Sequence, residues 1–159
     1  MTLTPRASEG ELVQRIWTEL QRATVDRHHE WRTPVLATVA QGGPQARTVV
    51  LRRADANASQ LIFFTDSRSP KVNELRATPA AVFVFWSNRL SWQLRVQVQS
   101  QVHIAGPRVE EAWARVSQSA AAGDYLAARA PGSALHPAAA SEPGPHHLAV
   151  VTADVKEMD

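Results

Sequence analysis

The 159-residue sequence has no cysteine, which excludes disulfide bonds, thiolate metal sites and a thiol nucleophile. No apolar run approaches the roughly 18 residues of a membrane-spanning helix, and the first ten residues lack the apolar segment of a secretion signal. Lys and Arg number 17 against 15 Asp and Glu, and no basic run is long enough for a nucleic-acid patch. We therefore expect a soluble, cytoplasmic, single-domain protein that binds neither nucleic acid nor membrane.

Several motifs of enzyme active sites are also missing. The chain contains no GxGxxG, P-loop or GxSxG sequence. Its histidine pairs, His28-His29 and His146-His147, are adjacent in sequence and so lack the four-residue spacing that directs two imidazoles to one metal. We expect no metal site.

Hydrophobic periodicity predicts a mainly β protein with helices. Ser8 and Glu11 form a capping box before a predicted amphipathic helix over residues 9–27. Strands are expected at residues 33–40, 45–53, 61–65, 80–86, 92–104 and 148–155. Five or six such strands with helices between them favour a small antiparallel barrel. We divide the single domain into an N-terminal helix (1–30), barrel core (33–106), helical segment (107–130), loop (131–146) and last strand (147–159).

The segment 92–104 has the clearest alternation. Apolar residues from Trp92 to Ile104 fall on one face, whereas the other face carries mostly glutamine, with Arg95 and His103. A glutamine-rich face suits a wet interface or a polar pocket. An ordinary solvent-facing surface is the other interpretation.

Two segments carry basic residues suited to an anion. In residues 47–53, three arginines interrupt a sequence that otherwise has the composition of a strand. Their planar guanidinium groups could pair with phosphate. The alternative is a surface strand whose arginines face water. After the next strand, Ser69 is a good N-cap and Pro70 suits the first helical position, with Arg68 and Lys71 on either side. The free N–H groups of a helix start also favour an anion.

At these residues the chain resembles the pyridoxamine-5′-phosphate oxidases and their related FMN-binding proteins, from Pro34 to Ser133. The pieces that carry the resemblance, in order, are Leu-Ala-Thr-Val at 36–39, Gly43-Pro44, Ala-Arg-Thr-Val-Val-Leu-Arg at 46–52, Phe-Phe-Thr at 63–65, Ser69 with Lys71, Phe85-Trp86, Gln93, and Tyr125, Arg129 and Ser133 at four-residue spacing. The resemblance implies an antiparallel six-stranded split β-barrel that forms a homodimer, with FMN in clefts between the subunits.

The resemblance also implies roles for individual residues. The expected FMN-binding residues are Arg47, Thr48, Val49, Val50, Arg52, Phe64, Thr65, Ser69, Lys71 and Gln93, with Arg47, Ser69 and Lys71 at the phosphate. The expected substrate-binding residues are Arg52, Tyr125, Arg129 and Ser133. No catalytic residue is assigned, because the flavin ring itself carries the redox chemistry.

Departures from the family pattern bear on the reaction. Phe64 stands where Tyr is frequent, and Pro70 stands where a basic residue is frequent, for which Arg68 is one replacement. Arg52 stands where the oxidases carry Lys, their Gln-Ser pair is replaced at 141–143, and the sequence ends before their C-terminal strand. The main hypothesis is therefore an FMN-dependent oxidoreductase acting on an unknown small molecule. The alternatives are an authentic pyridoxamine-5′-phosphate oxidase and a flavin-binding protein without turnover.

Strand geometry constrains two of the three arginines in the first basic segment. Arg47 and Arg52 are five residues apart, so in a regular strand they face opposite sides. Both can serve one site only if a bulge or a strand end lies between them. Pro131 makes one helix through Tyr125, Arg129 and Ser133 improbable, so Ser133 is expected to enter from a loop.

Overall fold

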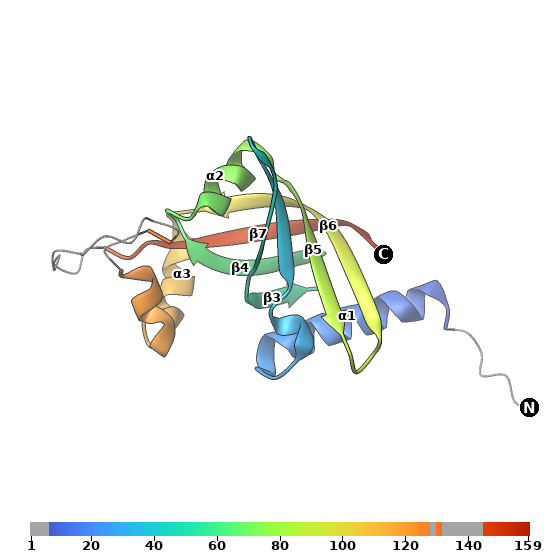
Figure 1. The fold of residues 1–159 in the computed structure, drawn as a ribbon. Coiled ribbons are helices and arrows are strands. Elements are labelled where there is room, and N and C mark those ends of the chain that lie inside the picture. The colour runs from blue at the N-terminus through green and yellow to red at the C-terminus, as the bar shows by residue number, and fades with distance from the viewer. Residues whose placement is uncertain (1–6, 128–129, 132–144) are drawn as a thin grey trace, which may run out of the picture.

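A computed structural model describes residues 7–127, 130–131 and 145–159. Seven strands form one antiparallel sheet in the order β2-β1-β5-β6-β7-β4-β3 (Figure 1). The strands are β1 (Val35–Ala40), β2 (Gly43–Thr48), β3 (Leu51–Asp55), β4 (Gln60–Asp66), β5 (Ala80–Ser87), β6 (Trp92–His103) and β7 (Leu148–Met158). The helices are α1 (Glu9–Val25), α2 (Pro70–Ala77) and α3 (Pro107–Val116), with 3-10 turns η1 (Glu30–Arg32) and η2 (Ala120–Tyr125).

The predicted strand 45–53 is two strands, so the expected number of six is wrong. β2 pairs with β1, whereas β3 pairs with β4, and these two strands lie at opposite edges of the sheet. In the short segment that joins β2 to β3, the Val49 N–H donates to the Pro34 carbonyl at 3.0 Å. The chain therefore crosses from one edge of the curved sheet to the other at Val49 and Val50. The predicted mainly antiparallel α+β architecture is confirmed.

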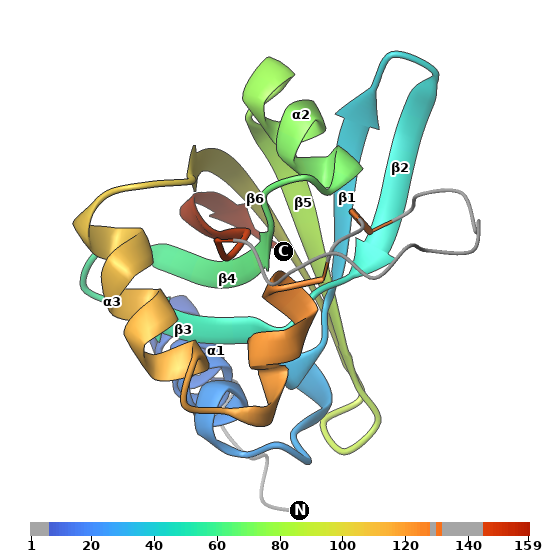
Figure 2. The ribbon, with the colours of Figure 1, turned by 90° about the vertical axis from the view of Figure 1, so that its left-hand side faces the viewer.

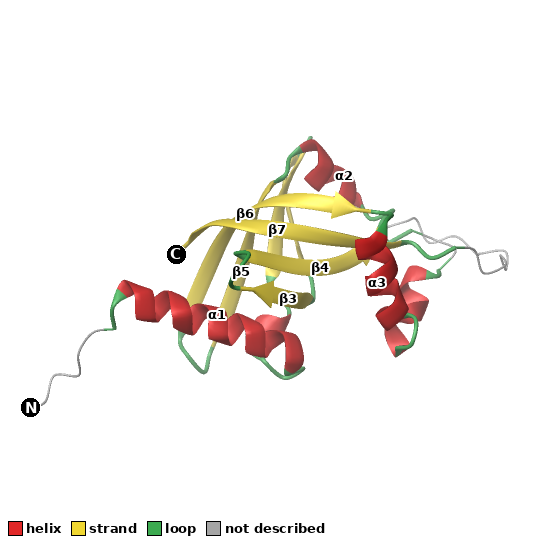
Figure 3. Cartoon of the chain, turned by 180° about the vertical axis from the view of Figure 1, so that it is seen from behind, coloured by secondary structure: helices red, strands yellow, loops and turns green. Residues whose placement is uncertain are grey.

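Helix α1 begins at the predicted capping box. The Ser8 N–H donates to Glu11 Oε2 at 2.7 Å, and the Glu11 N–H donates to Ser8 Oγ at 3.3 Å. The helix ends at Val25, two residues earlier than predicted. It runs beside β3 (Figure 3), and its buried residues, Leu20 among them, join the barrel core. No helix within the described residues is long and apolar enough to cross a membrane.

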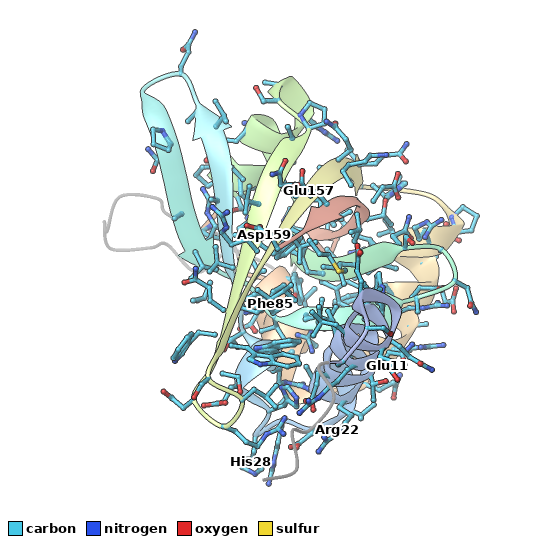
Figure 4. The ribbon with its side chains drawn as sticks, turned by 90° about the vertical axis from the view of Figure 1, so that its right-hand side faces the viewer. Glu11, Arg22, His28, Phe85, Glu157 and Asp159 are labelled. Atoms are coloured by element: carbon cyan, nitrogen blue, oxygen red, sulfur yellow. The ribbon has the colours of Figure 1, made fainter. Side chains whose placement is uncertain are left out.

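Large aromatic side chains fill the barrel. Trp31, Phe83 and Phe85 are fully buried, and the Trp31 and Phe85 ring centroids lie 5.6 Å apart. Figure 4 shows Phe85 inside the molecule, whereas Arg22 and His28 lie on its outside. Alternation along β6 is as predicted, with Leu94, Val96 and Val98 buried and Gln93, Gln97 and Gln99 exposed.

The helices cover only part of the outside of the sheet. α3 packs Val109, Ala112 and Val116 against β4 and β7, and α2 lies across one end of the barrel (Figure 2). The outward side chains of β1 and β5 are exposed or half-buried in the single chain. We call them the apolar outer face: Val35, Ala37, Val39, Val82, Val84 and Trp86.

Candidate functional site

The three residues predicted to bind the phosphate line one cavity. Arg47 reaches it from β2, and Ser69 and Lys71 reach it from the start of α2. The cavity has a volume of about 510 Å³. The two basic segments that the sequence singled out therefore meet in space.

Arg47 is held in a fixed orientation. Its guanidinium donates to Thr38 Oγ1 at 2.5 Å and to the two carboxylate oxygens of Glu74 at 2.8 and 3.3 Å. Thr38 is buried, and the Glu74 side chain is only 10% exposed. Both contacts with Glu74 come from Nη2, whereas Nη1 donates to Thr38 and to the Leu36 carbonyl at 3.4 Å, so acceptors on two sides hold the guanidinium in place. Sequence reasoning missed Glu74 and Thr38; the one available signal was that Glu74 lies three residues after Lys71 on the same helix.

Lys71 is surrounded by hydroxyl groups. Its ammonium donates to Thr65 Oγ1 and to Ser69 Oγ, each at 2.8 Å. Burial lowers the pKa of Lys71, the nearby Arg47 charge lowers it further, and Asp66 and Glu74 oppose both effects. Ser69 is the N-cap residue as predicted, but its hydroxyl makes no capping hydrogen bond and accepts from Lys71 instead.

This donor set fits a phosphate group. Two cations and the N-terminus of α2 converge there, and one carboxylate, Glu74, offsets part of the charge. Arg68 does not supply the contact missing at Pro70. It donates to both carboxylate oxygens of Asp66, at 3.0 and 2.7 Å, and to the Ala127 carbonyl at 2.9 Å.

Arg52 belongs to a second group of residues. The register of β3 against β4 shifts between Leu51 and Arg53, so the irregularity required for Arg52 is present. The Arg52 guanidinium carbon lies 5.6 Å from the centroid of the Phe64 ring. Burial raises the pKa of Tyr125, and the charge and hydrogen bond of Arg52 oppose that shift. Arg129 and Ser133 lie outside the described residues.

The other residues predicted to bind FMN do not line the cavity of Arg47 and Lys71. Val49 is buried at the crossing between β2 and β3, with Thr48 exposed before it and Val50 half-buried after it. Gln93 is exposed on β6 and lines a separate cavity of about 320 Å³ with residues of α1. A single chain therefore does not bring Gln93 to the cavity of Arg47 and Lys71.

Comparison with known proteins decides the family. The sequence model of one protein family, described as pyridoxamine 5′-phosphate oxidase, FMN-binding domain, matches residues 14–104 of this chain. The chain belongs to this family. The cofactor that the sequence predicted, FMN, is confirmed as the cofactor of this domain.

Curated relatives in the family are longer proteins. A pyridoxine/pyridoxamine 5′-phosphate oxidase of Chromohalobacter salexigens is 39% identical over 97 residues, which are 58% of this chain and 40% of the relative. The protein of the same name from Mycobacterium leprae is 41% identical over 101 residues, which are 64% of this chain and 39% of the relative. The match thus spans less than half of the length of either relative.

Solved structures show the same fold across nearly the whole chain. PhzG from Burkholderia lata 383, solved in complex with tetrahydrophenazine-1-carboxylic acid, has a TM-score of 0.71 at 20% identity. The aligned region covers 99% of this chain and 83% of the PhzG chain. A pyridoxamine 5′-phosphate oxidase-related FMN-binding protein from Nostoc punctiforme has a TM-score of 0.68 at 21% identity. The aligned region covers 96% of this chain and 83% of the Nostoc protein. At these identities the likeness establishes the fold.

Proposed function

We propose that the protein is an FMN-dependent oxidoreductase that acts on a small molecule in the cytoplasm as a homodimer. The observation that carries the proposal is the convergence of Arg47, Ser69 and Lys71 on one cavity. These residues combine a fixed guanidinium, a partly desolvated ammonium and a helix start, a set of groups suited to a phosphate dianion.

Each expected residue has a task toward the cofactor. Arg47 and Lys71 hold the phosphate, and Ser69 fixes the ammonium of Lys71. Phe64 and Thr65 would line the flavin through backbone and side chain, and residues 48–50 would pass next to it. The bound flavin supplies the electron transfer, so the protein needs only to orient it and exclude water around it.

Arg52 and Tyr125 point to an anionic substrate. Tyr125 is 8% exposed, and its hydroxyl is within the influence of the Arg52 charge. An arginine next to a buried phenol suits a carboxylate or phosphate on the substrate. Arg129 and Ser133 are expected to complete this group. Tyr125 favours the second candidate function, oxidation of pyridoxamine 5′-phosphate, whereas Arg52, which stands where the oxidases carry Lys, favours a flavin protein without turnover.

The apolar outer face supports the homodimer. Val35 and Val39 are 37% and 52% exposed on β1, and Trp86 is 52% exposed on β5. Exposed apolar patches on monomers commonly mark interaction surfaces. Gln93 pairs in register with Trp86, so it borders this face, and in a dimer it would approach the partner's flavin. Isologous association is the commonest arrangement for one type of chain.

The test is reduction of the FMN-loaded protein under anaerobic conditions. Pyridoxamine 5′-phosphate, NADH and NADPH are added separately, and the visible flavin absorption is followed. Bleaching by any of these compounds, with reoxidation by oxygen, is the result expected of an oxidoreductase. Rapid bleaching by pyridoxamine 5′-phosphate with peroxide release would establish the second candidate function. A flavin band that none of them bleaches would contradict turnover with these donors and favour a flavin-binding role.

A further inference from the structure

The connection between β4 and α2 contains an ion pair that has no task yet in the proposed function. Arg68 donates through Nε to Asp66 Oδ1 at 3.0 Å and through Nη2 to Asp66 Oδ2 at 2.7 Å. The Arg68 N–H adds a third hydrogen bond, to Oδ1 at 2.8 Å. Two parallel hydrogen bonds from one guanidinium to one carboxylate fix both the position and the plane of the guanidinium.

The charge of Asp66 depends on this partner. The Asp66 side chain is only 3% exposed, against 23% for Arg68. Burial has the largest single effect on Asp66 and raises its pKa, but the hydrogen bonds and charge of Arg68, with a smaller effect of His147, together lower the pKa below its ordinary value. A buried carboxylate without its partner would be an uncompensated charge, which is strongly unfavourable. The pair is therefore a fixed part of the connection.

The same Nη2 atom also holds the chain that follows η2. It donates to the Ala127 carbonyl at 2.9 Å, just beyond the end of this turn, where carbonyl groups lack partners within the helix. A basic side chain that donates to such carbonyls stabilises a helix C-terminus. In addition, the His147 N–H donates to the Tyr125 carbonyl and the Ser67 N–H donates to the His147 carbonyl, each at 2.7 Å. The connection between β4 and α2 thus holds the end of η2 both directly and through His147.

The segment held in this way borders both proposed binding groups. Tyr125 is 8% exposed, and the charge and a hydrogen bond of Arg52 act on its hydroxyl. Further along the chain, Pro131 lines the phosphate cavity. Ala127, whose carbonyl Arg68 holds, lies between Tyr125 and Pro131 in sequence. A change at Arg68 would therefore be felt first at Tyr125, two residues before the contact.

We propose that Arg68, fixed by Asp66, is a positioning residue that holds Tyr125 beside Arg52. The inference rests on the proposed function, in which Tyr125 and Arg52 belong to the substrate group. Arg68 acts through the Ala127 carbonyl and is not among the residues that line the phosphate cavity. The planar fork of arginine suits this task because it reaches the carboxylate and the carbonyl at once, whereas lysine offers a single ammonium.

The experiment follows Tyr125 by NMR in FMN-saturated protein that carries an isotope label at the tyrosine Cζ carbon. Tyr125 is the only tyrosine of the chain, so the label gives one signal, and its chemical shift also reports ionisation of the phenol. Burial raises the pKa of this phenol above its ordinary value of 10.0, and Arg52 opposes that shift. If Tyr125 is no longer held, the signal should move and the pKa should fall toward the ordinary value.

The main variant is Asp66→Asn/Arg68→Gln, which removes the cation together with the carboxylate that it balances and so leaves no unpaired buried charge. Arg68→Lys keeps a charge beside Asp66 and should give a signal between those of the double variant and the wild type. The matched control is Arg76→Lys, at an exposed position on α2, and it should reproduce the wild-type signal. Urea unfolding identifies the variants that are folded.

A folded double variant with the wild-type Tyr125 signal and titration would overturn the proposal. If the double variant does not fold, Arg68→Lys decides, and a wild-type signal there would equally overturn it.

A second measurement separates this inference from the proposed function. With the donor that bleaches the wild-type flavin under anaerobic conditions, the concentration for half-maximal reduction should rise about tenfold or more in the double variant, because a misplaced binding group weakens productive binding. An unchanged donor dependence, with the Tyr125 signal displaced, would overturn the part of Arg68 in the reaction. If no donor bleaches the wild-type flavin, the proposed turnover fails, while the Tyr125 signal still decides whether Arg68 holds Tyr125.

Discussion

Arg47 and Lys71 bring positive charge to the same cavity, but their surroundings differ. Arg47 is paired with the Glu74 carboxylate, whereas Lys71 donates to two neutral hydroxyl groups. A guanidinium stays protonated at any accessible pH, while a buried ammonium titrates more readily. The pH dependence of phosphate binding therefore belongs to Lys71.

FMN affinity is predicted to fall in the alkaline range. The pKa of Lys71 is lowered from 10.5, so this side chain loses its charge at a lower pH than a free lysine does. Above about pH 7 the phosphate is already a dianion, so the change arises in the protein. Fluorescence titration with FMN from about pH 7 to about pH 9.5 should show weakening in the wild type and less weakening in Lys71→Arg. Parallel curves for the two proteins would contradict this assignment.

At the scale of elements, one carboxylate ties η1 to the turn between β5 and β6. Glu30 accepts hydrogen bonds from Ser87 Oγ at 2.5 Å, from the Asn88 N–H at 3.0 Å and from the Arg89 N–H at 3.2 Å. The Ser87 hydrogen bond has the largest effect on Glu30. Desolvation opposes it, and the backbone N–H groups of Arg89 and Asn88 add to it, so the pKa of Glu30 is lowered from 4.5 to about 2. The charged form is therefore the one that holds the turn.

This carboxylate should contribute to acid sensitivity. Because the folded-state pKa is depressed, its stabilisation is complete above pH 4.5 and is lost as the pH falls to about 2. Urea unfolding across that interval should show a smaller loss of stability in Glu30→Gln than in the wild type. Ser87→Ala removes the hydrogen bond with the largest effect on the pKa of Glu30, so it should also lose less stability than the wild type over this pH interval. An unchanged slope in Glu30→Gln would show that the turn does not depend on this charge.

Local patterns predicted most elements but not how they pair. The capping box gave the start of α1, and alternation identified the buried and exposed faces of β6. The break at Val49 and Val50 carries no local signal, because two β-branched residues continue a strand pattern and only pairing with different partners separates β2 from β3.

The phosphate roles of Arg47, Ser69 and Lys71 were predicted from the family resemblance, with the basic segment and the N-cap pattern in support. The structure brings the three residues to one cavity, and their roles toward FMN stay predictions. Glu74 approaches Arg47 across 27 positions of sequence, and a glutamate in a helix is by itself ordinary. Gln93 lies away from that cavity in one chain, so its expected role depends on the dimer.

At the scale of the whole molecule, the proposed dimer would use the apolar outer face, one edge of which borders the cavity of Arg47 and Lys71. Val35 and Val84 are direct neighbours across β1 and β5, and Ala46 of β2 lines the phosphate cavity while pairing with Ala37. A partner seated on this face would therefore adjoin the edge of that cavity at Ala46.

Val84→Glu is predicted to convert the dimer into monomers. A symmetric interface brings two copies of the new carboxylate into an apolar contact, and burying unpaired charge is strongly unfavourable. Sedimentation velocity at micromolar concentration, with FMN present, distinguishes the two states. Val25→Glu, at the exposed end of α1, is the matched control and should remain dimeric. A wild-type monomer would contradict the proposed dimer, and a dimeric Val84→Glu protein would place its interface elsewhere.

The central claim, that Arg47 and Lys71 hold the FMN phosphate, is tested most directly by titrating FMN against alanine variants. Arg47→Ala should weaken binding about 10- to 150-fold, the equivalent of roughly 1.5–3 kcal/mol for a charged hydrogen bond, and Lys71→Ala should cost less. Because Arg47→Ala also leaves Glu74 unpaired, the double variant Arg47→Ala/Glu74→Gln should recover part of the loss. Arg76→Ala, outside the cavity, should bind FMN as the wild type does. Wild-type affinity in both Arg47→Ala and Lys71→Ala would place the phosphate elsewhere and contradict the account.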